Sequence, residues 1–351
     1  MADPVVSRPK PCLVSLKSGR TYFWCRCGRS ANQPFCDGSH KGTGLEPKTF
    51  VAAADEEVLL CACKHSSDAP FCDGAHTNLP GGSPLDDPAS PANRGIPSVT
   101  EREGPRLRLN GACYVVSPAL AEKARRGDLT YSYLVTAELG ATYQTQLLLE
   151  VSGGASPVMS LGDREVILFV IAGRGTINIS GRAFEVKATD GVYVRPSEAL
   201  QLLPASQTLK VFALSCPPGM LQWHEAMPGN FDARYEQRVA SVDEAQRQAT
   251  GPRYFQLLID KRIGSQVITQ FIGHIPQSKA APHRHLYEEA IIVLSGEGSM
   301  WTEDRKARVR AGDVIFLPRK QLHSLEATSA DGLDVVGVIC PGDNPSITYY
   351  D

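Results

Sequence analysis

Residues 282–296 form the stretch PHRHLYEEAIIVLSG, which combines potential metal ligands with an apolar run. His283, His285 and Glu289 share the same parity, so an extended chain places all three side chains on one face. The apolar residues that follow Glu289, and the glycine that ends them, predict a buried strand closed by a turn. His323 lies further downstream. Three imidazoles and one carboxylate suit Fe, Mn, Ni, Cu or Zn, and they can leave coordination positions open.

The spacing of these residues resembles the two metal-binding motifs of the cupin superfamily. The motif H-x-H-x3-E-x6-G spans His283 to Gly296, and the second motif matches at Gly312, Pro318 and His323. By this resemblance, a β-barrel interior holds one metal ion through His283, His285, Glu289 and His323. The chain departs from the motifs at three turn positions that do not bind metal, namely Gln277, Lys320 and Ala327. A structural cupin with an empty or inert site is the alternative.

Several other side chains of this region are candidates for the barrel lining. They are Tyr287, Arg319, Gln270, His274 and Trp301. Strand alternation from His283 places Tyr287 near the metal or at its rim, which makes Tyr287 the candidate catalytic residue. Ordinary packing or surface exposure is the competing interpretation for each of them.

The β-rich region is internally duplicated. Gly173 recurs as Gly296 and Pro196 recurs as Pro318, at offsets of 123 and 122 residues. Short runs rich in Val, Ile, Leu, Tyr and Thr alternate with Gly, Pro and Asp throughout, which is typical of sandwiches and barrels. The sequence therefore predicts two tandem β domains of similar size.

The first copy lacks a plausible ligand set. Its ligand positions are occupied by Ser160, Gly162, Val166 and Gln201, and Glu165 is one place out of register. We predict a structural or oligomerising barrel here, and the resemblance to cupins implies a homodimer. One metal-binding and one degenerate cupin resemble the bicupins related to ureidoglycine aminohydrolase over residues 106–351, although His323 replaces the glutamine of that enzyme.

Seven of the ten cysteines lie in the first 80 residues, in a second duplicated unit. The sequence CRC at 25–27 recurs as CAC at 61–63, and CDGSH at 36–40 recurs as CDGAH at 72–76, always 36 residues later. Such a small module has too thin an apolar core to fold alone, so a metal centre is expected to stabilise it. Three cysteines and one histidine per repeat suit Zn²⁺ or a [2Fe–2S] cluster.

The full pattern C-x-C-x2-S-x3-P-x-C-D-G-[SA]-H resembles the CDGSH iron–sulfur family in both copies. The resemblance implies one [2Fe–2S] cluster per motif. The ligands of the first cluster would be Cys25, Cys27, Cys36 and His40. Those of the second would be Cys61, Cys63, Cys72 and His76. Two zinc knuckles are the alternative.

These observations predict a mainly β chain, with a small duplicated CDGSH module followed by two tandem cupin (double-stranded β-helix or jelly-roll) barrels. The expected divisions are a double CDGSH domain at 1–80, a linker at 81–105, an N-terminal cupin at 106–230, a helical connection at 231–253 and a C-terminal cupin at 254–351. The helical expectation rests on Ser241-Val242-Asp243-Glu244, which has the form of a capping box.

Composition excludes several classes of function. A net charge of -2 over 351 residues argues against a nucleic-acid-binding protein. No run approaches the ~18 apolar residues of a membrane helix, and the first residues lack the apolar core of a secretory signal. We therefore expect a cytoplasmic location, where cysteines serve as ligands or buried thiols.

The combination of motifs predicts a non-haem Fe(II) oxygenase that acts on a small molecule. Two [2Fe–2S] clusters would pass electrons from an external reductase or ferredoxin-like donor to the cupin metal. One alternative is a hydrolase, lyase or isomerase that uses Mn, Zn or Ni, with structural or regulatory clusters. Another is a non-enzymatic iron–sulfur redox sensor or cluster carrier. This prediction rests on the association of domains.

Overall fold

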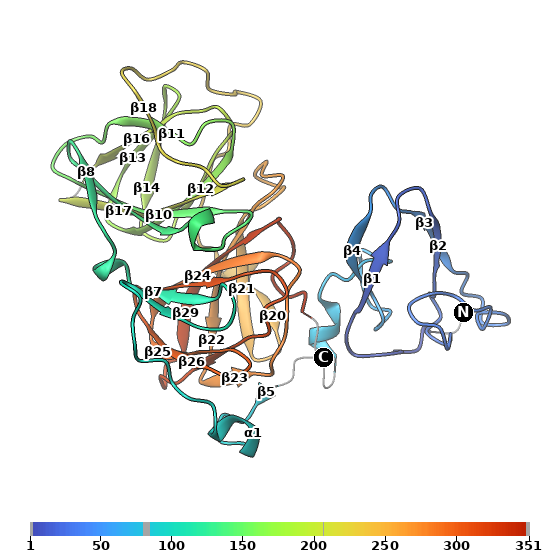
Figure 1. The fold of residues 1–351 in the computed structure, drawn as a ribbon. Coiled ribbons are helices and arrows are strands. Elements are labelled where there is room, and N and C mark those ends of the chain that lie inside the picture. The colour runs from blue at the N-terminus through green and yellow to red at the C-terminus, as the bar shows by residue number, and fades with distance from the viewer. Residues whose placement is uncertain (1–2, 80–84, 206, 349–351) are drawn as a thin grey trace.

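The computed structural model describes residues 3–79, 85–205 and 207–348, and Figure 1 shows a small N-terminal module beside two stacked barrels. The described chain is almost entirely β, and its one α-helix within those residues is the single turn α1 (Pro91–Arg94). The predicted fold class, a CDGSH module followed by tandem cupin barrels, is confirmed. Within the same residues, no helix has the length and apolar character needed to cross a membrane.

Two antiparallel strand pairs build the N-terminal module. They are β1 (Cys12–Leu16) with β4 (Glu56–Leu60), and β2 (Thr21–Trp24) with β3 (Lys48–Val51). A 3-10 turn, η1 (Ala75–Asn78), contains His76, the last predicted ligand of the second motif. Trp24 is buried in the module core, and its indole N–H donates to the Cys61 carbonyl at 2.7 Å. The core therefore ties the β2–β3 pair to the second ligand loop.

A seven-stranded and a five-stranded sheet form the first barrel. The seven-stranded sheet has the order β19 (Val239–Ala240), β15 (Gly191–Val194), β12 (Glu165–Ala172), β17 (Thr208–Cys216), β10 (Thr145–Ser152), β9 (Leu129–Val135) and β8 (Ala124–Arg126). The five-stranded sheet has the order β14 (Arg182–Lys187), β13 (Arg174–Ile179), β16 (Leu200–Pro204), β11 (Val158–Ser160) and β18 (Gln222–His224). Aliphatic side chains from both sheets fill the interior of the first barrel.

The second barrel has the same two-sheet plan. Its strands come from two parts of the chain, one before and one after the first barrel. Its larger sheet has the order β20 (Gln248–Thr250), β21 (Arg253–Ile259), β22 (Thr269–Ile275), β29 (Leu333–Cys340), β24 (Glu288–Ser295), β27 (Val314–Leu317), β7 (Tyr114–Val116) and β6 (Arg106–Arg108). Its smaller sheet has the order β26 (Lys306–Arg310), β25 (Glu297–Trp301), β28 (Ser324–Ala327), β23 (Ser278–Ala280) and β5 (Leu85–Asp86). Two sheets built in this way place alternate side chains in a common interior.

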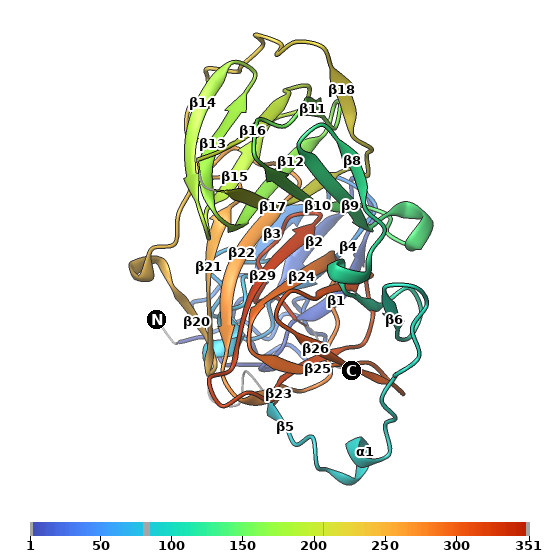
Figure 2. The ribbon, with the colours of Figure 1, turned by 90° about the vertical axis from the view of Figure 1, so that its left-hand side faces the viewer.

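Segments that we assigned to the linker and to the first barrel therefore belong to the second barrel's sheets. Strand β5 pairs with β23, and Asp86 forms an ion pair at 2.8 Å with the buried ammonium of Lys279. Strand β7 pairs with β27, and β6 pairs with β7. Figure 2 shows this stretch running along the second barrel before the chain enters the first. The pairing is long-range, so no local pattern could reveal it.

The helical connection predicted over 231–253 is wrong. That stretch contains a 3-10 turn, η4 (Glu244–Gln246), the short strands β19 and β20, and the first residue of β21. The Asp243 side chain does cap the turn, accepting from the Ala245 N–H at 3.0 Å. The chain then leaves helical geometry at Arg247 and enters β20, because pairing with β21 satisfies its backbone groups instead. Two other 3-10 turns are η2 (Pro118–Leu120) and η3 (Ala137–Leu139).

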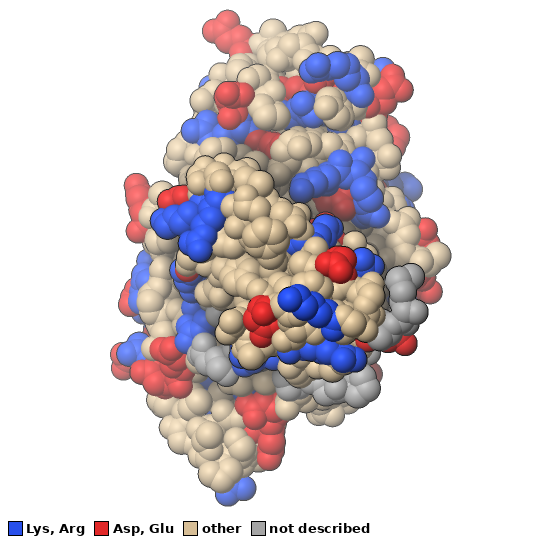
Figure 3. Space-filling view, turned by 90° about the vertical axis from the view of Figure 1, so that its right-hand side faces the viewer, with Lys and Arg blue, Asp and Glu red and all other residues tan. Residues whose placement is uncertain are grey.

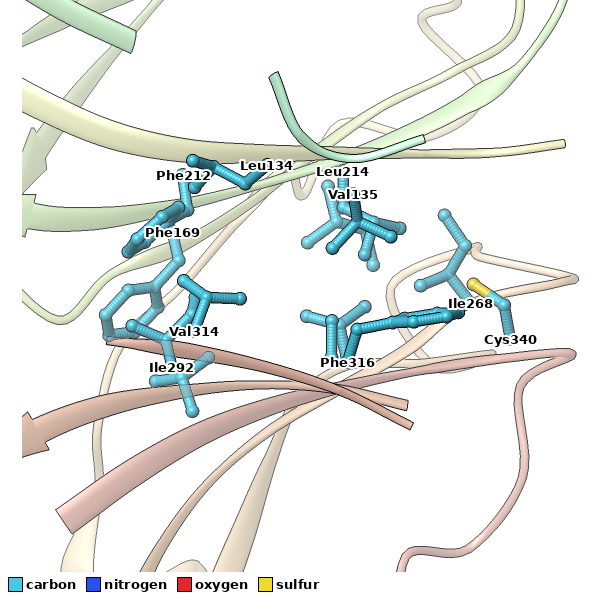
Figure 4. Packing of buried hydrophobic residues seen from close by; sticks show 14 of the residues in the cluster. Leu134, Val135, Phe169, Phe212, Leu214, Ile268, Ile292, Val314, Phe316 and Cys340 are labelled. Atoms are coloured by element: carbon cyan, nitrogen blue, oxygen red, sulfur yellow. The ribbon is translucent and has the colours of Figure 1, made fainter. Parts of the chain in front are cut away.

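The two barrels pack face to face through their larger sheets. Figure 4 shows Phe169, Phe212 and Leu214 of the first barrel opposed to Ile292 and Phe316 of the second. These side chains are almost completely buried. The large apolar contact holds the barrels together as one unit.

Two glutamates, one from each barrel, make hydrogen bonds across the same interface. Glu288 accepts from the backbone N–H groups of Thr142 and Tyr143 at 2.6 and 2.9 Å. Glu165 accepts from the hydroxyl of Ser265 at 2.7 Å and from the Gln266 N–H at 2.8 Å. The two glutamates stand 123 positions apart, as the repeat requires. Glu165 is thus the counterpart of Glu288, which explains why it is out of register with Glu289, the predicted metal ligand.

Replacing Glu165 with alanine is expected to lower the free energy of unfolding by about 1–3 kcal/mol, because it leaves buried donors without an acceptor. Denaturant titration measures the change. Glu150→Ala is the matched control, since Glu150 is 39% exposed and forms only a 3.9 Å pair with Lys210. Equal losses of unfolding free energy in the two variants would contradict a stabilising role for the hydrogen bonds of Glu165.

A buried ion pair joins Glu198 of the first barrel to Arg238. The Arg238 guanidinium is fully buried and makes two hydrogen bonds to Glu198, at 2.5 and 2.9 Å. Glu198 also accepts from the backbone N–H groups of Arg195 and Asp232. The remaining donors of Arg238 reach the carbonyls of Tyr235 and Asp232. Both charges are therefore satisfied without water.

Candidate metal centres

The four predicted cupin ligands come together at the start of β24 and β28. His283 and His285 lie just before β24, and Glu289 is its second residue. His323 lies immediately before β28. His283 and His323 exchange backbone hydrogen bonds of 3.0 Å in both directions, and this isolated bridge joins the two motifs.

All three imidazoles have the same orientation relative to the centre. Each Nδ1 lies at hydrogen-bond distance from a backbone carbonyl. For His283, His285 and His323 these carbonyls belong to Ala281, Ile347 and Gln321, at 2.8, 3.0 and 2.8 Å. A carbonyl only accepts, so each Nδ1 carries the proton and each Nε2 presents its lone pair. One ring nitrogen from each histidine lies within 4.8 Å of the other two.

Burial shifts the pKa values of the four predicted cupin ligands. It lowers the pKa of His283 and His285 well below the ordinary value, and that of His323 to about 4. Burial also raises the pKa of Glu289 to about 8, and its carboxylate lies 3.7 Å from His285. Neutral imidazoles are the form that binds metal, and a divalent cation would remove the cost of a buried carboxylate. The residues therefore fit a metal ion.

A cavity of 140 Å³ adjoins the four ligands. Its walls are mainly apolar and include Phe255, Phe271, Ile275, Ile291, Leu325 and Val335. Arg253, Tyr254 and His274 supply polar atoms, and Pro345 and Ser346 of the C-terminal segment complete the lining. Such a space admits a small molecule next to the four ligands.

The other candidates of this region do not all reach the cavity. His274 lines it and is paired with Asp334 at 2.9 Å. Tyr287 instead stacks on the outer side of the His285 ring, with centroids 4.6 Å apart, and faces the cleft beside the N-terminal module. Arg319 lies in that same cleft. Gln270 lies at the interface of the barrels, where its side-chain amide donates a hydrogen bond to the Leu168 carbonyl at 3.4 Å.

Trp301 is buried and donates its indole N–H to Glu326 at 2.8 Å, outside the cavity lining. The structure thus brings the four proposed ligands together but separates Tyr287 from the space where a substrate would bind. Burial keeps the pKa of Tyr287 well above its ordinary value, so its hydroxyl stays neutral. Packing against His285 is its visible role.

The first barrel places no such group at the equivalent positions. Val166 is buried among aliphatic side chains. The Ser160 hydroxyl bonds to His224 at 2.8 Å, and the Gln201 amide bonds to the Ser156 carbonyl at 2.8 Å. Within the described ranges, the three cupin histidines of the second barrel are the one set of three or more such ligand atoms within 4.8 Å of one another.

The N-terminal ligands are arranged in pairs. In the first motif, the Cys25 and Cys27 sulfurs are 3.7 Å apart, and Cys36 Sγ lies 3.1 Å from His40 Nδ1. In the second, the two corresponding distances are 3.6 and 3.3 Å, in the pairs Cys61–Cys63 and Cys72–His76.

The paired arrangement bears on which metal fits. A single tetrahedral Zn²⁺, with Zn–S distances of ~2.3 Å, would hold all four ligand atoms within about 4 Å of one another. In the described chain, neither CDGSH motif brings three ligand atoms within 4.8 Å of one another. Two separate ligand pairs match a cluster with two irons, each held by one pair. The hydrogen bond between Cys61 and Cys63 lowers the pKa of the Cys61 thiol and raises that of Cys63, and burial raises the pKa of Cys72, so bound metal would be needed to hold all three as thiolates.

The two CDGSH sites differ in their surroundings. His40 is partly exposed, and its Nε2 lies 3.2 Å from the Glu46 carboxylate. His76 is 1% exposed, and its Nε2 has no hydrogen-bond partner among the described residues. The second site is also the one that contacts the second barrel, through Cys72 and Ile347. Lys320 and Glu57 form an ion pair across the same contact.

Three residues near these sites escaped the sequence analysis. Lys64 is 7% exposed and lies between the two CDGSH sites, although it stands where the first repeat has Gly28. Gln33 reaches from the first site to Lys64. Ile347 holds His285 from the C-terminal segment. The mismatch of Lys64 with Gly28 was visible in the repeat, whereas the role of Ile347 had no local signal.

Comparison with known protein families defines the class of each part. The cupin domain family matches residues 273–339, and the family described as iron-binding zinc finger CDGSH type matches residues 6–41 and 45–77. The protein carries a CDGSH iron–sulfur domain at its N-terminus and a cupin domain in its second barrel. A CDGSH domain implies a [2Fe–2S] cluster, and cupin domains bind a metal.

Particular relatives match a short part of the chain. The mitochondrial CDGSH iron-sulfur domain-containing protein 3 is 57% identical in Mus musculus and 55% identical in Homo sapiens, over 53 residues in each case. Those residues are 14% of this chain. The chain spans 39% and 42% of the length of these two relatives.

Solved structures match the two barrels. Oxalate decarboxylase of Lactobacillus farciminis, in its formate complex, superposes with a TM-score of 0.54 at 14% identity, covering 65% of this chain and 86% of that one. Protein Ylba of E. coli superposes with a TM-score of 0.50 at 18% identity, covering 71% of this chain and 94% of that one. At these identities the likeness shows a shared bicupin fold alone.

Proposed function

We propose that this protein is a non-haem Fe(II) oxygenase that acts on a small molecule and receives electrons through two [2Fe–2S] clusters. The observation that supports it best is the contact between the iron–sulfur module and the cupin centre. Cys72 packs against Ile347, and the Ile347 carbonyl accepts from His285 at 3.0 Å. One short segment thus touches a ligand of each kind of site.

The residues of the second barrel suit this chemistry. A bound Fe²⁺ would supply Lewis-acid and one-electron chemistry, with coordination positions left open by four protein ligands. Carbonyls fix the three imidazoles in the metal-binding tautomer, and mainly apolar residues line the 140 Å³ cavity beside them. The first barrel would then be structural, and its large contact with the second would hold the centre rigid.

The proposal includes partners. An external reductase or a ferredoxin-like protein would reduce the clusters, and the partly exposed first site is the better docking point because His40 is more accessible than His76. The substrate would be small enough for the cavity. We also propose a homodimer, which cupin barrels form through sheet edges.

Metal and sulfide analysis of the anaerobically purified protein tests the cofactors. We expect about four irons and four acid-labile sulfides from two two-iron clusters, plus about one further iron per chain. Four irons with one Mn, Zn or Ni would favour the Lewis-acid hydrolase, lyase or isomerase. Zinc without sulfide would contradict the cluster assignment.

Oxygen uptake tests the reaction. With a chemical reductant and a panel of small substrates, we expect O2 consumption that is lost when Zn²⁺ replaces the cupin iron. No uptake with any substrate would contradict the oxygenase. Transfer of clusters to an apo-acceptor, without O2 uptake, would favour a cluster carrier.

A further inference from the structure

The ligand loop of the second CDGSH site rests directly on the C-terminal segment, residues 343–348. The Asn344 amide donates to the Asp73 carbonyl at 2.8 Å, next to the ligand Cys72. The side chains of Cys72 and Ile347 belong to one buried apolar cluster. An added Cβ atom at Gly74 would overlap the Ser346 hydroxyl oxygen, so the loop and the C-terminal segment approach each other closely here.

The same segment leads to a ligand of the cupin centre. The Ile347 N–H donates to the Asn344 carbonyl at 3.1 Å. The Ile347 carbonyl then accepts from Nδ1 of His285 at 3.0 Å. A path of three hydrogen bonds, joined by stretches of covalently bonded chain, therefore runs from Cys72, through Asn344 and Ile347, to His285.

A second bridge joins the two CDGSH sites. The Gln33 amide donates to the sulfur of Cys25 at 3.4 Å, and its oxygen accepts from the Lys64 ammonium at 2.8 Å. The Lys64 backbone N–H donates to the sulfur of Cys61 at 3.2 Å. Lys64 and Gln33 thus link a ligand of the first site to a ligand of the second.

The backbone conformation and the burial of Lys64 are both energetically unfavourable for a lysine. Its φ of 68° is left-handed, a conformation that costs a non-glycine residue energy, and the first repeat has Gly28 with a φ of 78° at the matching position. Its ammonium is also buried, with contacts to Gln33, to the Cys61 carbonyl and to the Trp24 ring at 4.5 Å. A strained, buried lysine persists where surrounding structure holds it, and such strain is concentrated at functional sites.

We propose that these two bridges form an ordered electron relay, from the first cluster through Gln33 and Lys64 to the second, and from there through Asn344 and Ile347 to the metal at His285. The proposal rests on the function proposed above. In each step one electron leaves a reduced cluster, which is oxidised by one unit, and the next centre is reduced by one unit. No covalent bond forms or breaks.

The test is anaerobic and uses the whole chain with both clusters and with Fe³⁺ in the cupin site. Flash photoreduction supplies substoichiometric electrons. Visible absorbance follows cluster re-oxidation, and electron paramagnetic resonance follows the loss of ferric iron at the cupin site. In the unaltered protein the two signals should change together, and Zn²⁺ in the cupin site should abolish cluster re-oxidation.

Two variants separate the bridges. Asn344→Ala should slow re-oxidation of both clusters by about tenfold, the lower end of the effect of losing an outer-shell partner. Lys64→Gly suits the left-handed backbone and should slow the first cluster by about the same factor, while the second keeps its rate. Iron and sulfide content should match the unaltered protein in both.

Asn230→Ala is the matched control. Like Asn344, Asn230 uses both its amide nitrogen and its amide oxygen in side-chain hydrogen bonds, to Ser197 and Ser180, but it packs on the first barrel. Unchanged rates in Asn344→Ala and Lys64→Gly would overturn the relay and leave the oxygenase standing. An unaltered protein whose clusters never reduce the cupin iron would overturn the proposed function and the relay with it.

Discussion

Replacing His283 with alanine is expected to empty the cupin site while both CDGSH centres stay loaded. The substitution removes one of three imidazoles whose orientations are fixed, so metal affinity should fall by more than the about 10–100-fold that follows loss of an outer-shell partner. The backbone bridge between residues 283 and 323 does not depend on the side chain, so the barrel should keep its shape. Metal analysis by mass spectrometry and competition with a chelator measure the loss.

His274→Ala is the matched control for that experiment. His274 lines the same cavity, but its ring stacks on Tyr254 and pairs with Asp334. We expect it to keep the cupin metal at the level of the unaltered protein. A His283→Ala protein with full metal content would place the ion elsewhere and would contradict the ligand set.

Replacing Arg238 with alanine should lower the free energy of unfolding by about 3–5 kcal/mol, because it leaves Glu198 as an uncompensated buried charge. The Glu198 side chain is only 2% exposed. Denaturant unfolding followed by circular dichroism measures the effect. Replacing both members, as Arg238→Met with Glu198→Leu, should restore most of the loss, since an apolar pair of similar size carries no desolvation penalty.

The control is Arg234→Ala. Arg234 also makes two hydrogen bonds to a carboxylate, that of Asp232, but its side chain is 81% exposed. Exposed ion pairs contribute about 0–1 kcal/mol, so this change should have little effect. Equal destabilisation by the two alanine variants would show that the burial of Arg238 is not what makes it important.

The sequence predicted those parts of the molecule that depend on local spacing. The parity of His283, His285 and Glu289 placed them on one face, and the structure gathers them with His323 around one centre. The CDGSH motifs likewise bring cysteines and histidines of one loop together. Ligand sets of this kind lie within short segments, so their spacing reveals them in the sequence even where, as before β24, the chain is not a regular strand.

Features made by distant segments were out of reach. Tyr287 was placed on the metal side by alternation, but the chain is not a regular strand before β24, and the ring turns to the back of His285. The predicted helix near 241–244 gave way to the pairing of β20 with β21. Glu165 appeared to be a displaced ligand because its true partners, at 265–267, are about a hundred residues away in sequence.

The pairing of β7 with β27 has a consequence for biosynthesis. Val116 and Val314 pair across the sheet, although 198 positions separate them in the chain. At about 5–20 residues per second, a ribosome needs roughly 10–40 s to deliver the second strand after the first. The first barrel is completed during that interval, so a nascent chain carries an orphan strand that waits for its neighbour. A fragment that starts at residue 254 would lack that strand altogether and should be recovered aggregated rather than folded.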